Sequence, residues 1–177
     1  MSRITPLTLE EAGPMARKQL DAQIAKSGRA TNMKRTLARS PMALHAFMHW
    51  YDLHSEVVEF LGERGAMLFA HAVSSQTECL ICSTFFRRWL QQAGENPDEL
   101  KFDDREQTIV DYGRQLARNS NAVPDELFSK LQRYFNPDEL VSLTAFAGLM
   151  VATNLFNNAL KVDLDEYLVP FRKDASA

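Results

Sequence analysis

Ser75-Gln-Thr-Glu-Cys-Leu-Ile-Cys82 carries both cysteines of this 177-residue chain. It lies inside a segment, Ala66 to Gln92, whose composition is helical and which closes at Ala93-Gly94, where glycine suits a left-handed cap. Three residues apart on a helix, two Cα atoms lie about 5–5.5 Å from each other. A disulfide between Cys79 and Cys82 could therefore close without large backbone movement.

This spacing favours thiol redox chemistry. One sulfur, as a thiolate, can attack an oxidant and become a sulfenic acid, with which the other condenses to a disulfide and water. A zinc site needs two further ligands, and neither a second cysteine pair nor a nearby histidine pair supplies them. A thioredoxin-like site needs a βαβ setting that this helical pattern lacks. The alternative is that both cysteines are inert core residues.

Two arrangements of the flanking residues are open, and they give different roles to His71 and Glu78. Ser75-x-x-Glu78 has the form of a capping box, so a new helix would begin there and its dipole would favour both thiolates, with Glu78 as a cap. If the segment is instead one unbroken helix, His71, Glu78 and Cys82 lie along one stripe and His71 becomes the proton partner of the thiol. The candidate catalytic residues are therefore Cys82, Cys79, His71 and Glu78.

The rest of the chain also predicts helices, because it holds only 7 glycines and 7 prolines. Thr8-Leu-Glu-Glu11 has the form of a capping box that opens a helix running to about Ser27-Gly28. Further helices are predicted over 33–39, 41–61, 66–92, 104–118, 125–134 and 137–159, before a tail around 163–171. Asn96-Pro-Asp-Glu-Leu100 recurs as Asn136-Pro-Asp-Glu-Leu140, which indicates two helix starts or an internal duplication. The fold class is all-α.

Composition bounds the partners and the compartment. Hydrophobic residues make up 45% and charged residues 24% of the chain, which is typical of a globular protein. A formal charge of −3 gives no basic surface for nucleic acid. The N-terminus lacks an apolar run of signal-peptide length, and we expect no membrane span because no uninterrupted apolar stretch of about 18 residues occurs. A soluble, cytoplasmic protein is expected.

Neither a metal nor an organic cofactor is expected. The sequence has no glycine-rich phosphate loop and no cluster of ligating residues. His45 and His49 are spaced for one helix face and could share a metal ion. Phe47 and Trp50 lie beside them, and these neighbours favour packing or an interface.

Three segments together resemble the alkylhydroperoxidase D and carboxymuconolactone decarboxylase-like family. They are the cysteine pair, Ala93-Gly-Glu-Asn-Pro-Asp-Glu-Leu100 and Thr153-Asn-Leu-Phe-Asn-Asn-Ala-Leu160-Lys-Val-Asp-Leu-Asp165. The likeness spans roughly residues 65–165. It implies a multi-helix bundle of the alkylhydroperoxidase D-like type over 41–177, preceded by an N-terminal helical extension over 1–40. It also implies a homo-oligomer, as a dimer, trimer or hexamer.

The resemblance implies thiol-dependent, peroxiredoxin-like reduction of an organic hydroperoxide. In the peroxidase members the second cysteine attacks the hydroperoxide and the first resolves it. Cys82 is then peroxidatic and Cys79 resolving. An external dithiol protein would return the electrons.

The sequence departs from the family at the proton relay. Where peroxidase members have a glutamate and two histidines, this chain has Met67, Ile81 and Phe86. Thiolate formation would need the helix dipole, His71 or Glu78 instead. Two other functions stay open: a redox-sensing or binding protein of the same fold, and a carboxymuconolactone decarboxylase-type enzyme that does not need the cysteines.

Overall fold

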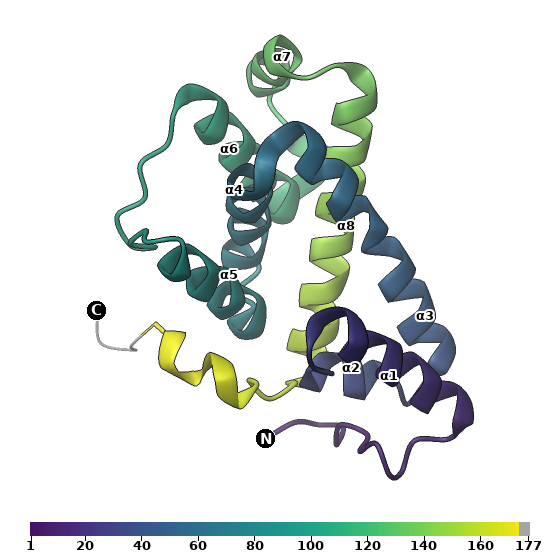
Figure 1. Ribbon diagram of the computed structural model, residues 1–177. Coiled ribbons are helices and arrows are strands. Elements are labelled where there is room, and N and C mark those ends of the chain that lie inside the picture. The colour runs from purple at the N-terminus through teal and green to yellow at the C-terminus, as the bar shows by residue number, and fades with distance from the viewer. Residues whose placement is uncertain (174–177) are drawn as a thin grey trace.

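The structure, a computed structural model, describes residues 1–173 as helices joined by short loops, with no strand in that range (Figure 1). The α-helices are α1 (Pro14–Ser27), α2 (Asn32–Leu37), α3 (Pro41–Trp50), α4 (Asp52–Gln76), α5 (Leu80–Gln92), α6 (Asp104–Asn119), α7 (Asp125–Tyr134) and α8 (Pro137–Leu160). Two 3-10 helices, η1 (Ser120–Ala122) and η2 (Glu166–Phe171), follow α6 and α8. The predicted all-α class is confirmed.

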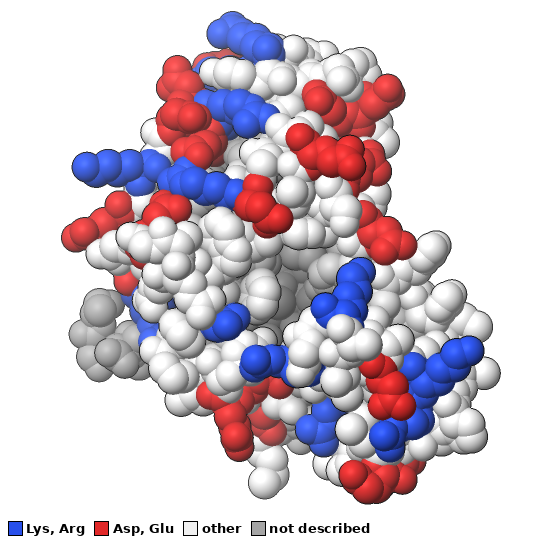
Figure 2. All heavy atoms as spheres, viewed as in Figure 1, with Lys and Arg blue, Asp and Glu red and all other residues white. Residues whose placement is uncertain are grey.

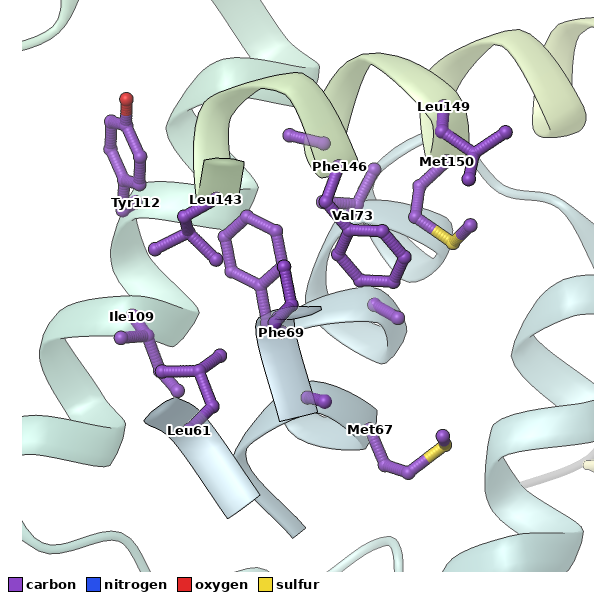
Figure 3. Close-up of a cluster of buried hydrophobic side chains, with 14 of the residues drawn as sticks. Leu61, Met67, Phe69, Val73, Ile109, Tyr112, Leu143, Phe146, Leu149 and Met150 are labelled. Atoms are coloured by element: carbon purple, nitrogen blue, oxygen red, sulfur yellow. The ribbon is translucent and has the colours of Figure 1, made fainter. Parts of the chain in front are cut away.

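The main core forms around α4, which packs against α5, α6 and α8 (Figure 1). Phe69 of α4 is fully buried, and its ring centroid lies 6.2 Å from that of Phe146 on α8 and 6.4 Å from that of Tyr112 on α6. Figure 3 shows these rings among the surrounding aliphatic side chains. Glycine at position 113 lets α6 approach, since a Cβ there would lie 3.1 Å from the Phe69 ring.

A second buried cluster joins the N-terminal helices to one another. It holds Leu20, Leu37 and Leu44 from α1, α2 and α3, and Phe156 of α8 packs against it. The predicted boundary between an extension over 1–40 and a domain over 41–177 stays a prediction.

The local signals at the helix starts were only partly right. Thr8 and Glu11 do form the predicted reciprocal bonds, since the Thr8 N–H donates to Glu11 Oε2 at 3.0 Å and the Glu11 N–H to Thr8 Oγ1 at 3.2 Å. The helix nevertheless begins later, at Pro14. The reason is that Gly13 is extended and proline is favoured at the first helical position.

Two predicted helices are broken where no proline marks the break. The predicted helix 41–61 divides at Tyr51, which ends α3 and precedes α4. Past residue 61, where the predicted helix ends, α4 continues through a kink at Gly62, with φ 75° and ψ 162°. The predicted helix 66–92 divides at Glu78, whose φ is 53°. A non-glycine residue rarely adopts that conformation, so this break has no signal in the residue types.

The two copies of the Asn-Pro-Asp-Glu-Leu motif behave differently. Asn136 and Glu139 form a capping box, and α8 begins between them. The first copy lies in the loop after α5, where Asn96 Oδ1 accepts a hydrogen bond from the Asp98 N–H and no helix follows until residue 104. The shared letters therefore indicate a favourable cap in one place and a turn in the other.

Helix α8 is long and apolar enough to span a membrane by length and composition alone, and 50% of its most apolar window is buried inside the protein. The expectation of no membrane span stays an expectation. The buried face of α8 supplies Leu143, Phe146 and Leu149 to the main core. Its other face leaves Val141 and Leu155 exposed.

Candidate functional site

The break between α4 and α5 places both cysteines at the start of a helix. Cys79 occupies the N-cap of α5 and Cys82 lies in its first turn, and both are free thiols. The turn is fixed by local bonds: the Cys79 N–H donates to the Ser74 carbonyl at 3.0 Å and Ser83 Oγ donates to the Cys79 carbonyl at 2.7 Å. The N–H groups of a first turn stabilise negative charge, so the position favours a thiolate.

Neither predicted arrangement of the flanking residues is correct. Ser75 stays inside α4 and caps no helix, while the helix does not run unbroken to Cys82. Glu78 is exposed in the left-handed conformation and is not the predicted cap. The capping-box arrangement also predicted that the cysteines lie at the start of a new helix, and this is confirmed. A catalytic role for Glu78 stays a prediction.

Two asparagines of α8 donate hydrogen bonds to the turn between α4 and α5. Asn154 Nδ2 donates to Thr77 Oγ1 at 2.8 Å, and Asn158 Nδ2 donates to the Thr77 carbonyl at 2.9 Å. Asn154 Nδ2 also donates to Ser74 Oγ at 3.3 Å. The turn is thereby held against the last two turns of α8.

Asn157, one turn from Asn154, contacts both sulfurs. Its Nδ2 donates to Cys82 Sγ at 3.4 Å and approaches Cys79 Sγ to 3.9 Å. The side chain is buried, and its Oδ1 has no hydrogen-bond partner among the described residues. A buried amide carbonyl without a partner costs free energy, which is characteristic of a site that binds a ligand.

The two sulfurs share one proton. The hydrogen bond from the Cys82 thiol is the largest cause that lowers the pKa of Cys79 to about 7, and it outweighs burial. The N–H groups of Cys82 and Ile81 and the Asn157 amide also lower the pKa of Cys79, although none makes a cap bond of ordinary geometry to its sulfur. Donation to Cys79, together with burial, raises the pKa of Cys82. Near neutral pH a substantial fraction of Cys79 is therefore thiolate, while Cys82 stays a thiol.

Both cysteines are buried, and they differ slightly in residue exposure. Cys79 is 0% exposed and Cys82 is 9% exposed. Figure 2 shows the surface hollowed at the centre of this face, where Figure 1 has the space between α5 and α8. On the same face Lys and Arg side chains are interspersed with Asp and Glu.

The three positions that the resemblance assigns to a proton relay hold apolar side chains. Met67 and Phe86 are buried in the same cluster as both cysteines. Ile81 packs against that cluster and is partly buried. None of these side chains can transfer a proton.

His71 faces a different environment from the sulfurs. Its Nε2 lies 3.3 Å from Ser75 Oγ, and its ring meets that of Phe86 edge to face. With Asp98 and Arg114 it lines a cavity of about 230 Å³. Burial, followed by nearby arginine charges, lowers the pKa of His71 to about 4, so it is neutral at pH 7. No hydrogen bond among the described residues joins it to a cysteine, and its catalytic role stays a prediction.

The histidines of α3 lie apart from the cysteine pair. The His45 and His49 rings stack with centroids 6.0 Å apart, and His49 Nδ1 lies 3.1 Å from Asp52 Oδ2. Within residues 1–173 there is no group of three or more potential ligands that could hold a metal ion.

Asn157 is the site residue that reasoning from single residues missed. It lies in the segment 153–165 that carries the resemblance. The available signal was the spacing of Asn154, Asn157 and Asn158 on a helix that has no charged residue after Glu139. Buried amides on one helix face need partners, and these point to the turn that holds the cysteines.

The sequence matches no protein-family model, and no curated protein matches it. Solved structures do match. A peroxidase-related protein from Ralstonia eutropha JMP134, described as an alkylhydroperoxidase AhpD core, is 17% identical with a TM-score of 0.73 over 94% of each chain. A peroxidase-related protein from Silicibacter sp. TM1040 is 22% identical with a TM-score of 0.73, over 95% of this chain and 96% of that one. The debrominase Bmp8 is 16% identical with a TM-score of 0.77 over 95% of each chain.

These likenesses show that the fold is of the alkylhydroperoxidase D-like type, as the sequence resemblance implied. They also extend the likeness. The sequence indicated it over roughly 65–165, whereas the structural match takes in 94–95% of the chain.

Proposed function

We propose that this chain, which has the alkylhydroperoxidase D-like fold, reduces organic hydroperoxides through a Cys79–Cys82 disulfide. The observation that carries the proposal is the geometry of the pair: two free thiols at one helix start, both within reach of the Asn157 amide, sharing a proton. Such a pair already holds a thiolate near neutral pH, which is the form that attacks oxidants.

Cys82 is the proposed point of attack, as the resemblance implies, and it is the residue of the pair that retains some exposure. The sulfur takes the terminal oxygen of the hydroperoxide, becoming a sulfenic acid as the O–O bond breaks and an alcohol leaves. The Cys79 sulfur then displaces water from that sulfenic acid. Two thiols and one hydroperoxide thus give one disulfide, one alcohol and one water. The hollow between α5 and α8 is the proposed route of approach (Figure 2).

The proposed test is consumption of cumene hydroperoxide with dithiothreitol as the regenerating dithiol. We expect turnover at a rate well above that of dithiothreitol alone, and loss of at least 99% of it in Cys82→Ser. His71→Gln serves as a second variant. This variant should lose most of the activity if His71 is a proton partner. It should retain most of the activity if His71 only lines its own cavity.

A wild-type rate no higher than that of Cys82→Ser would overturn the proposal. The second candidate, a redox-sensing protein of the same fold, would then take its place. The apolar side chains of Met67, Ile81 and Phe86 favour that candidate, because they cannot protonate the alkoxide as the family's proton donors would.

The partners and compartment are proposed on the same basis. An external dithiol protein would reduce the disulfide, and the cytoplasm would keep both thiols reduced between turnovers.

We also propose a homo-oligomer, as the resemblance implies. Val141 and Leu155 leave apolar surface of α8 open to a second copy, with exposed fractions of 68% and 67%. Sedimentation velocity should show a species larger than one chain, and a monomer at all concentrations would contradict this.

A further inference from the structure

We infer that Cys79 is the proton acceptor and donor for Cys82, in addition to resolving its sulfenic acid. The inference rests on the proposed function for its catalytic meaning. The inference goes beyond the proposed function because it gives Cys79 a task before the disulfide forms. In this chain that task replaces the relay whose positions are apolar.

The position of Cys79 suits it to accept a proton. Cys79 lies at the N-cap of α5 and is completely buried, and one donor, Asn157 Nδ2, lies 3.9 Å from its sulfur and 3.4 Å from that of Cys82. The Asn157 amide reaches both sulfurs, so it can stabilise the negative charge on either one. A proton can therefore move from Cys82 to Cys79 while the charge stays within reach of the same donor.

The other groups that face the sulfurs are neutral. Ser74 from α4 and Asn157 from α8 contribute a hydroxyl and an amide, while Met67 and Phe86 are apolar. Tyr51, between α3 and α4, is the remaining titratable neighbour, and its hydroxyl lies 3.3 Å from Thr153 Oγ1. Burial, and to a smaller extent the charges of the two cysteines, raise the pKa of Tyr51, so it stays protonated.

The proton balance closes with the pair and one proton from solvent. The Cys82 thiol passes its proton to the Cys79 thiolate and attacks the hydroperoxide, giving the Cys82 sulfenic acid and an alkoxide. The Cys79 thiol returns the proton to the alkoxide, which leaves as the alcohol. The Cys79 thiolate then attacks the Cys82 sulfur and displaces hydroxide, which takes one proton from solvent to become water. The hydroperoxide is reduced, and the pair loses two electrons to the disulfide.

The test measures how the reactivity of Cys82 depends on pH in the wild type and in Cys79→Ser. Serine keeps a good N-cap residue at this position, so the variant should fold. Alkylation of Cys82 by iodoacetamide is followed by peptide mass spectrometry. In parallel, a dimedone-type trap measures sulfenic acid on Cys82 of the variant after a pulse of cumene hydroperoxide.

In the wild type we expect the alkylation rate of Cys82 to rise with a midpoint near the pKa of Cys79, about 7, because Cys82 passes its proton to the Cys79 thiolate. In Cys79→Ser the midpoint should move to the ordinary thiol range or above, with about a tenfold or greater loss of rate at pH 7. The trapped sulfenic acid should form correspondingly more slowly. An unchanged midpoint and a wild-type rate of sulfenic acid formation would show that Cys79 only resolves, and would overturn the inference.

The two failures are distinguishable. If neither protein reacts with the hydroperoxide but the alkylation midpoint moves, the proposed function fails and the proton sharing stands. If the wild type reduces the hydroperoxide but the midpoint does not move, the function stands and the inference fails.

Discussion

Replacement of Asn157 by leucine is expected to raise the pKa of Cys79 and to slow oxidation of the pair by about tenfold at pH 7. Leucine has the same branched arrangement of heavy atoms as asparagine but no N–H donor, so both sulfurs would lose the bonds of 3.4 and 3.9 Å. The negative charge would then face an alkyl group, which disfavours the thiolate. Thiolate absorbance near 240 nm against pH reports the pKa directly.

Asn158→Leu is the matched control. Asn158 is exposed and donates to the Thr77 carbonyl, not to a sulfur. This variant should keep the thiol titration of the wild type and lose about 1 kcal/mol of stability at most. A leucine at 157 that left the titration where it was would show that the amide does not stabilise the thiolate.

Phe69→Ala is expected to lower the free energy of unfolding by about 3–5 kcal/mol, the usual cost of removing a buried aromatic ring. Phe69 is fully buried, its ring lies near those of Tyr112 and Phe146, and the gap at Gly113 is shaped to it (Figure 3). The loss would leave a cavity between α4, α6 and α8 that rigid neighbours cannot fill. Urea unfolding followed by circular dichroism measures it.

Phe128 provides the control for ring removal at the surface. It lies on α7 and its side chain is 38% exposed. Phe128→Ala should cost less than about 1 kcal/mol. Equal losses in the two variants would mean that the core is not centred on α4 as described.

The helix content and several helix ends were predictable because their signals are local. Asn136 and Glu139 cap α8 through their own side chains, and Asp103 and Glu106 do the same for α6. The break at Glu78 was not predictable, because glutamate in the left-handed region has no local preference for it. That conformation is imposed by the surrounding packing and by the bonds from α8 to the turn.

The same break explains how much of the site could be predicted. The Cys79–Cys82 pair was predictable from spacing alone. Residues three apart in a helical turn lie close together, whether or not the helix is interrupted before Cys79. The predicted alignment of His71 with Cys82 required one continuous helix. Because the helix breaks between them, the two residues no longer share one helix face. Asn157 comes from a helix that is distant in sequence, and only tertiary packing brings it to the sulfurs.

The most direct measurement of the central claim is peptide mapping by mass spectrometry after the prereduced protein receives one equivalent of cumene hydroperoxide. The account predicts an intramolecular Cys79–Cys82 disulfide in most molecules and one equivalent of cumyl alcohol. Cys79→Ser should instead carry a sulfenic acid on Cys82. Two free thiols and unconsumed hydroperoxide, under conditions where the folded protein is intact, would contradict the account.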